Sequence, residues 1–315
     1  MYQVLEGGTR MDGGTRTSVG HFTNERIERE FRTAYAAAMA LWPPHESIDV
    51  ATEYGTTRAY RYGQGTGVPI VLLHGHGANS SNWYHQVAEL GRHHPVYAID
   101  TIDDPGASVQ RRPVADSPAA ADWLAQSLAG LGLDAVHLAG LSYGGWLVLN
   151  QAIHRPEQLV SITLLDPGGL AKVPLRFMLS LLATLFAMQL PKSWRRVPAR
   201  LLGEQALVER AEIMDPVLLG ARGYRPNRSP ARRFTDDELR RVTVPVQLIM
   251  GERTKLLRPA HALARARRFL PVRRAEIVPG VGHAIPLEAP ALVTDRILTF
   301  IEQTAERGGV AADPE

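Results

Sequence analysis

Residues 136–146 read VHLAGLSYGGW, which places a glycine–x–serine–x–glycine pattern between an apolar stretch and a helical one. A serine in such a strand-to-helix turn has a strained backbone, and the turn closes only if Gly140 and Gly144 carry no side chain. The turn exposes the hydroxyl of Ser142 at the sheet edge, where the following helix favours an anion. The pattern also occurs in ordinary glycine-rich turns, but its context here predicts that Ser142 is a nucleophile.

Short apolar segments alternate with helical patterns on both sides of this turn. Strands are expected at Pro69–Leu73, Val96–Ile99, Ala135–Ala139, Leu159–Leu165, Val246–Met250 and Ala275–Ile277, and helices at Asp116–Leu131, Ser142–His154, Ala260–Leu270 and Pro290–Thr304. Apolar strands separated by helices predict an α/β fold in which a mostly parallel central sheet is covered by helices on both faces.

The rest of the chain is expected to organise around this sheet. Residues 1–20 are predicted to be a flexible arm, residues 21–305 one domain and residues 306–315 a flexible tail. Residues 24–42 show an amphipathic helical pattern, and a segment near Trp83 to Leu90 is also expected to be helical. Residues 168–237 lack strand patterns, so we expect a helical cap inserted between two strands.

Composition excludes several classes of protein. The chain has 315 residues, of which 45% are hydrophobic and 21% charged, as in an ordinary globular protein. Its 35 basic and 32 acidic residues nearly balance, and no nucleic-acid recognition motif accompanies them. The lack of cysteine excludes disulfides and thiol nucleophiles. Residues 1–20 contain no apolar run typical of a secretory signal, so a cytoplasmic location is the default expectation. The sequence does not indicate an oligomeric state.

A glycine-rich turn follows the strand expected at residues 69–73. It reads His74-Gly75-His76-Gly77, and such a turn can offer a backbone N–H beside the nucleophile. The N–H groups of His76 and Tyr143 would then form an oxyanion hole. The two histidines could instead share a metal, but no third ligand follows at a suitable spacing, so no metal is expected.

A histidine follows the last expected strand, in the segment 278–288 that reads VPGVGHAIPLE. Serine needs a base to act as a nucleophile near neutral pH, and histidine has a suitable pKa. His283 is therefore predicted to be the general base.

With these three segments in this order, residues 45–305 resemble the α/β-hydrolase family and look closest to bacterial serine carboxylesterases. The resemblance implies an α/β-hydrolase fold with a cap, acyl transfer through an acyl-enzyme, and no cofactor. It also implies that Trp83 and Tyr143 border the substrate pocket.

The third member of a catalytic triad departs from the family pattern. The family commonly has an acid three residues after the glycine that ends the strand at residues 246–250, and Thr254 stands there. Asp166, after the strand at residues 159–165, is the first candidate to replace it, and Glu252 is the alternative. A Ser142–His283 dyad without an acid is the third possibility.

The expected cap contains an apolar stretch, Val173 to Leu190, that includes Phe177 and Leu181. It is predicted to cover an apolar acyl pocket lined by these two residues, with ordinary core or contact with a membrane surface as alternatives. Its uninterrupted apolar length is too short for a stable membrane span.

The predicted function is hydrolysis of a small or medium hydrophobic carboxylic ester, or of a thioester or C–C bond by the same acyl chemistry. The missing acid at Thr254 leaves open a biosynthetic tailoring enzyme, such as a cyclase or lyase. A ligand-binding protein without catalytic activity is the alternative from another class.

Overall fold

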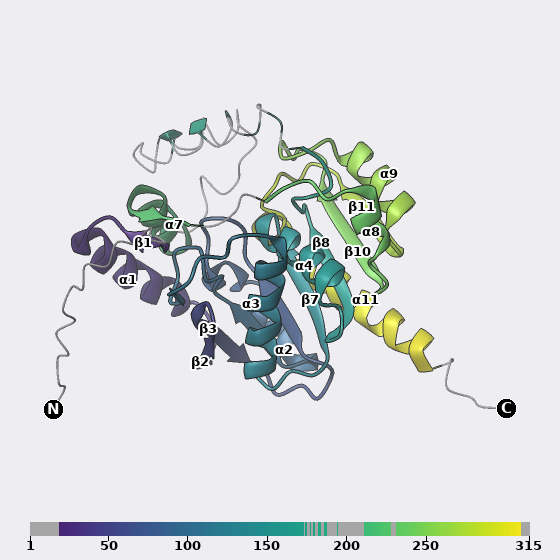
Figure 1. Ribbon diagram of the computed structural model, residues 1–315, viewed down its shortest axis with the longest axis horizontal. Helices are drawn as coiled ribbons and strands as arrows, with labels where there is room; N and C mark the ends of the chain where they lie inside the picture. The colour runs from purple at the N-terminus through teal and green to yellow at the C-terminus, as the bar shows by residue number, and fades with distance from the viewer. Residues whose placement is uncertain are drawn as a thin grey trace, which may run out of the picture.

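A central sheet with flanking helices forms the body of the protein (Figure 1). The computed structural model describes residues 19–309 except 173, 175, 176, 178, 180, 181, 184, 185, 188–193, 195–210 and 228–230. The predicted arm up to residue 18, most of residues 173–210 of the predicted cap and the last six residues therefore lie outside the described residues. Their predicted structure stays a prediction.

The described residues form a nine-stranded sheet in the order β11-β10-β8-β7-β4-β5-β3-β2, with β6 paired to β3. The strands are β2 (Glu46–Thr52), β3 (Gly55–Tyr62), β4 (Ile70–Leu73), β5 (Val96–Ile99), β6 (Val109–Gln110), β7 (Val136–Leu141), β8 (Leu159–Leu165), β10 (Val246–Gly251) and β11 (Val272–Val278). All pairs from β5 to β11 are parallel, whereas β2, β3 and β6 pair antiparallel. The predicted mostly parallel sheet is thus confirmed.

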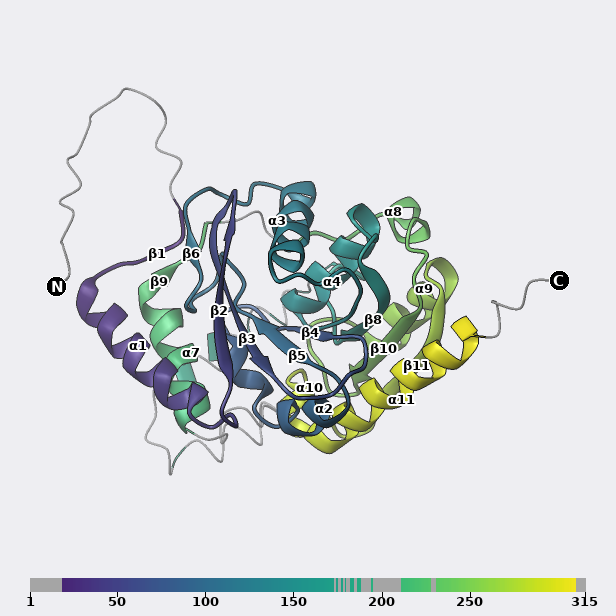
Figure 2. The ribbon, with the colours of Figure 1, turned by 90° about the horizontal axis from the view of Figure 1, so that it is seen from below.

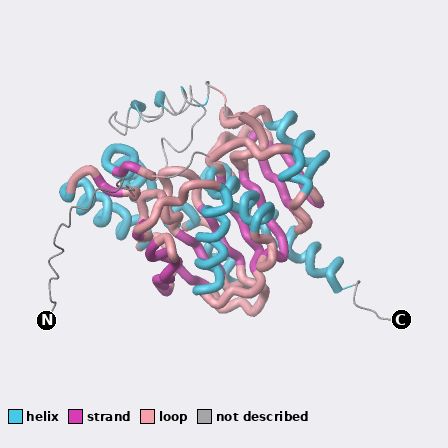
Figure 3. The backbone as a smooth tube through the Cα atoms, viewed as in Figure 1, coloured by secondary structure: helices cyan, strands magenta, loops and turns pink. Residues whose placement is uncertain are grey.

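Apolar side chains alternate between the two faces of the central strands, as a period of two requires. On β4, Val71 and Leu73 join one core cluster, and Ile70 and Leu72 join the other. The first cluster packs against α3 (Ser117–Gly130), α4 (Tyr143–His154), α8 (Asp236–Arg240) and α9 (Pro259–Phe269). The second packs against α1 (Glu25–Met39), α2 (Val87–His93) and α11 (Pro290–Gly309). Figure 2 shows these two helical layers on opposite sides of the sheet, and Figure 3 distinguishes the helices from the strands by colour.

The N-terminal helix α1 lies alongside α7 (Ala211–Gly223) at one end of the sheet (Figure 2). Asn24 begins α1 by accepting a hydrogen bond from the Ile27 N–H at 2.9 Å. The short strands β1 (His21–Phe22) and β9 (Tyr224–Arg225) pair beside them. The predicted cap region, in which no strand was expected, therefore contains β9 and is joined through it to the start of the domain.

Some element boundaries differ from those expected. The segment predicted as one helix near Trp83 consists of a 3-10 turn, η1 (Ser80–Trp83), followed by α2. The side chain of Asn79 accepts a hydrogen bond from Ser81 N–H and begins that short turn. Helix α11 continues to Gly309, into the predicted tail, and a further short helix, α10, covers Ile285–Glu288. Among the described residues, no helix is long and apolar enough to cross a membrane.

Candidate active site

Ser142 occupies a strained turn between β7 and α4, as the sequence predicts. Its φ of 55° lies in the left-handed region, which residues other than glycine rarely adopt. A Cβ placed on Gly144 would lie 2.2 Å from the Leu73 carbonyl oxygen, and one on Gly140 would lie 2.4 Å from the Gly144 backbone. Both positions therefore require glycine. The turn is also tied to its neighbours, because the Ser142 N–H donates to the Leu165 carbonyl at 3.0 Å.

His283 and Asp166 meet next to this turn, although 117 residues separate them in the chain. His283 Nδ1 lies 2.5 Å from Asp166 Oδ2. Asp166 follows β8, is fully buried and has a φ of 42°, while the His283 side chain is 19% exposed. An ionised carboxylate only accepts hydrogen bonds, so Nδ1 carries the proton and Nε2 has a lone pair for use as a base.

The other two residues considered for the acid position have different contacts. Glu252 is exposed, and its carboxylate accepts a hydrogen bond from the Gly280 N–H at 2.8 Å. Thr254 is buried, and its hydroxyl is hydrogen-bonded to Oδ2 of Asp166. Of the two acids that the sequence offered, Asp166 is therefore the one placed against His283.

The glycine-rich turn after β4 lies beside the nucleophile. A Cβ on Gly75 would be 3.5 Å from the Cβ of Ser142. Asp104, which is buried, accepts hydrogen bonds through Oδ1 from the Gly77 N–H and from His76 Nδ1, both at 3.0 Å. The turn that carries the predicted oxyanion donor is therefore fixed by hydrogen bonds to the carboxylate of Asp104.

His74, the first residue of this turn, is buried, and its side chain stabilises the local backbone. Its Nε2 accepts the Thr101 N–H at 3.0 Å, so its Nδ1 carries the proton and donates to the Gly75 carbonyl at 2.8 Å. Both ring nitrogens thus bond to the backbone. This arrangement argues against the metal pair of His74 and His76.

Tyr143, the second predicted oxyanion residue, has its side chain fixed in the interior. Its hydroxyl donates to Asp103 Oδ2 at 2.8 Å, and its ring stacks on Trp146 at a centroid distance of 5.7 Å. Trp146 stacks in turn on Phe234 at 5.4 Å. The first turn of α4 is thereby immobilised next to Ser142.

The predicted pocket residues have different environments. The rings of Phe177 and His283 form a T-shaped pair with 5.5 Å between their centroids, so this residue of the predicted cap reaches the candidate site. Trp83 is 1% exposed and packs in the core cluster that faces α1 and α2, and Leu181 lies outside the described residues. Their pocket roles stay predictions.

Other apolar residues of the same segment face solvent. Leu179, Leu182 and Phe186 are 57%, 61% and 69% exposed. These three side chains are therefore outside the core, whereas Ala187 of the same segment is buried in a cluster with residues of α1 and α7, so the alternative interpretations of the segment stay open.

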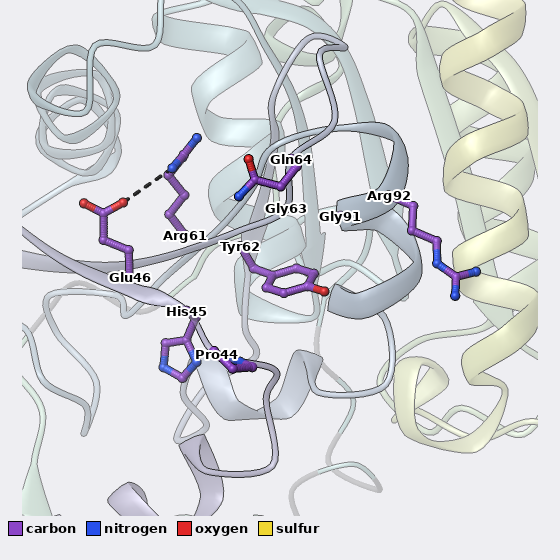
Figure 4. A pocket seen from close by; sticks show the side chains of 9 residues that line it. All are labelled: Pro44, His45, Glu46, Arg61, Tyr62, Gly63, Gln64, Gly91 and Arg92. Atoms are coloured by element: carbon purple, nitrogen blue, oxygen red, sulfur yellow. Dashed lines mark hydrogen bonds and ion pairs between the residues drawn. The ribbon is translucent and has the colours of Figure 1, made fainter.

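A surface cavity of about 600 Å³ lies at the other end of the sheet (Figure 4). It is lined by Pro44, His45, Glu46, Arg61, Tyr62, Gly63, Gln64, Gly91 and Arg92. Tyr62 pairs with Val96, the first residue of β5, whereas Ser142 follows the last residue of β7. The cavity is thus at the amino ends of the parallel strands and is separate from the candidate site.

Glu288 supports the histidine loop, a role that the sequence analysis did not identify. Its carboxylate accepts hydrogen bonds from the N–H groups of Gly282 at 2.8 Å and Ala284 at 3.2 Å, the two neighbours of His283. Burial raises the pKa of Glu288 above its ordinary value, and these hydrogen bonds oppose the shift. Glutamate five residues after the histidine was visible in the sequence, but its return to the loop depends on the turn of α10.

One protein family and several known proteins are similar to this chain. A family model for the alpha/beta hydrolase family matches residues 70–296. The chain is 28% identical over 287 residues to the uncharacterized carboxylesterase nap of Bacillus subtilis (strain 168), covering 87% of this chain and 92% of that protein. It is 29% identical over 282 residues to carboxylesterase YbfK of the same organism, covering 86% and 93%. The crystal structure of naproxen esterase (carboxylesterase NP) from Bacillus subtilis superposes with a TM-score of 0.79 at 27% identity and covers 88% of this chain and 99% of that one.

Proposed function

Because the chain belongs to the alpha/beta hydrolase family and is an esterase-type hydrolase, we propose that it cleaves hydrophobic carboxylic esters through an acyl-enzyme on Ser142. His283 is the general base and Asp166 the acid of the triad. The observation that carries this assignment is the 2.5 Å contact between His283 Nδ1 and Asp166 Oδ2 beside the Ser142 turn. No cofactor takes part in the proposed reaction.

The proposed mechanism follows from these contacts. His283 Nε2 removes the hydroxyl proton of Ser142 as the oxygen attacks the ester carbonyl, and Asp166 stabilises the imidazolium that forms. The backbone N–H groups of His76 and Tyr143 receive the negative charge that develops on the carbonyl oxygen. The imidazolium then protonates the leaving alcohol, and water releases the acid by the reverse sequence of proton transfers.

A small hydrophobic ester is the proposed substrate class. The Phe177 ring lies against the His283 ring, with 5.5 Å between their centroids, which supports an apolar acyl side of the pocket. The two relatives nap and YbfK, each matching more than four fifths of the chain, are called carboxylesterases, which supports an ester over a thioester or a C–C bond. A cytoplasmic location stays a prediction, which cell fractionation would test.

The alternative of a tailoring enzyme was motivated by the absence of an acid at Thr254. The contact of Asp166 with His283 supplies a carboxylate to the imidazole and removes that motive. A binding protein without activity is disfavoured, because the chain is a hydrolase of this family.

Intact-mass measurement after reaction with a fluorophosphonate probe tests the proposal. We expect one adduct on the wild type, none on Ser142→Ala and strongly slowed labelling of His283→Ala. Asp166→Asn should lower the turnover of a p-nitrophenyl ester about 10⁴-fold, while Glu252→Gln keeps it. An unlabelled, well-folded wild type, or a loss confined to Glu252→Gln, would contradict the assignment.

A further inference from the structure

Thr254 stands where the family commonly has its acid, and it donates a hydrogen bond to Asp166, the proposed acid of this chain. Its oxygen accepts the N–H of Leu256 at 3.3 Å, and its hydroxyl is hydrogen-bonded to Asp166 Oδ2. An ionised carboxylate cannot donate, so the hydroxyl proton points to Asp166. The Leu256 N–H occupies a lone pair on the hydroxyl oxygen and supports this direction. Because Thr254 is only 6% exposed, bulk water competes little for the same hydrogen bond.

Two donors therefore meet on one oxygen of Asp166. They are the Thr254 hydroxyl and His283 Nδ1. The other oxygen, Oδ1, is buried and has no hydrogen-bond partner among the residues that the structure describes. The torsion that turns an aspartate carboxylate is soft, so one donor alone leaves its rotation poorly restrained. The second donor on Oδ2 restricts that rotation.

We propose that Thr254 is a positioning residue, whose hydroxyl holds the Asp166 carboxylate so that Oδ2 accepts the Nδ1 proton of His283. This inference rests on the proposed function and adds a residue to it. Thr254 occupies the place where the family commonly has its acid, but here it orients an acid supplied by the neighbouring strand.

The strand register explains how residues 166 and 254 reach the same imidazole. Strands β8 and β10 are parallel neighbours in which Leu165 is paired with Ile249, and the Asp166 N–H donates to the Ile249 carbonyl at 2.8 Å. Thr254 and His283 contact the same carboxylate oxygen. A carboxylate moved to residue 254 is therefore expected to reach His283 as well.

Steady-state kinetics on a p-nitrophenyl ester test the role of Thr254. Thr254→Ser keeps the hydroxyl and should retain kcat within about two-fold, whereas Thr254→Val should lower kcat about ten-fold with an unchanged KM. Asp166→Asn should lower kcat about 10⁴-fold. The double variant Asp166→Asn/Thr254→Asp relocates the acid and should recover at least about ten-fold of that loss.

Thr163→Val is the matched control. Thr163 is 4% exposed, and its hydroxyl bonds Gln247 across the same two strands without contacting the site. It should keep the wild-type kcat. Equal losses in Thr163→Val and Thr254→Val, or a loss that Thr254→Ser shares, would overturn the positioning role.

Proton NMR provides a readout that does not require turnover. A histidine N–H bound to a carboxylate gives a far-downfield resonance when it is protected from exchange. We expect it in the wild type and Thr254→Ser, and expect exchange to weaken it in Thr254→Val. The resonance could be present in the wild type and Thr254→Ser and weakened in Thr254→Val, while the wild type hydrolyses no ester. The proposed function would then fail, and the positioning role would stand. If the resonance is the same in Thr254→Val and the wild type, the positioning role fails.

Discussion

The carboxylate of Asp104 accepts the backbone N–H of Gly77 at 3.0 Å, one residue after the proposed oxyanion donor His76. The same oxygen contacts His76 Nδ1 at 3.0 Å, and the other accepts the Thr101 hydroxyl at 3.3 Å. Asp104 is 1% exposed, so water does not take over these bonds. Its carboxylate therefore fixes the orientation of the turn that faces Ser142.

Asp104→Asn should accordingly weaken the oxyanion hole. The amide keeps the size of the side chain but cannot accept all three hydrogen bonds. We expect kcat to fall about ten-fold or more with little change in KM. Loss of a single oxyanion donor lowers kcat about 10²- to 10³-fold, and this variant is expected to displace a donor without removing it. Affinity for a trifluoromethyl ketone, which forms an oxyanion on the serine, should fall in parallel. Asp122→Asn, at an ion pair on the surface, is the matched control. Unchanged ketone affinity in Asp104→Asn would show that Asp104 does not shape the hole.

The sequence could predict the parts of this site in which the contacting residues are close together in the chain, and not those in which they are far apart. The turn at Ser142 is local, since Gly140 and Gly144 reveal the close approach within a few residues. Asp166, as the first candidate for the acid, and His283 could be predicted because each follows a recognisable strand. The bond from Thr254 to Asp166 could not be foreseen, because it joins residues 88 apart and depends on the register of β8 and β10.

Irregular elements were less predictable for a related reason. The segment near Trp83 has helical residue types, but the Asn79 cap forms a short 3-10 turn before α2 begins. The hydrogen bonds of Asp104 with His76 and Gly77 were similarly missed. The sequence after β5 indicates only a turn, and the direction of its carboxylates is set by the tertiary fold.

The strain at Ser142 predicts a stability difference between two inactive variants. Ser142→Ala keeps a Cβ at a φ of 55°, whereas Ser142→Gly removes it. Relief of this strain outweighs the larger entropy of an unfolded glycine, so Ser142→Gly should be more stable than Ser142→Ala by about 1 kcal/mol. Urea unfolding of both proteins measures the difference. Equal stabilities would mean that the turn is not strained in solution.

His137 on β7 predicts a loss of stability in acid. Burial, with a smaller effect of His94, lowers its pKa from the ordinary value of 6.5 to about 4, and its Nδ1 lies 2.8 Å from the Ser161 hydroxyl. As pH falls below 6.5, the unfolded chain binds a proton that the folded protein excludes. The free energy of unfolding should therefore drop by about 3 kcal/mol between pH 6.5 and 4 from this residue alone.

His137→Asn should remove this part of the pH dependence, because the amide can still bond Ser161 but does not titrate. The comparison requires urea unfolding of both proteins at pH 7, 5.5 and 4.5. As pH falls, the free energy of unfolding of the variant should rise relative to that of the wild type. A constant difference across this range would exclude His137 as the source of acid sensitivity.

Two phenylalanines of one segment should respond differently to truncation. Phe177 contacts the His283 ring, whereas Phe186, nine residues later, is 69% exposed. If Phe177 forms part of the acyl pocket, Phe177→Ala should lower kcat/KM for a hexanoate ester by about ten-fold, since burying a side chain of this size contributes roughly 1.5–3 kcal/mol. An acetate ester, which has little apolar surface to bury, should lose less. Phe186→Ala should change neither ester by more than about two-fold, because exposed side chains contribute little. Equal losses for both esters in Phe177→Ala would instead assign this ring to the support of His283, since a displaced base slows every substrate alike.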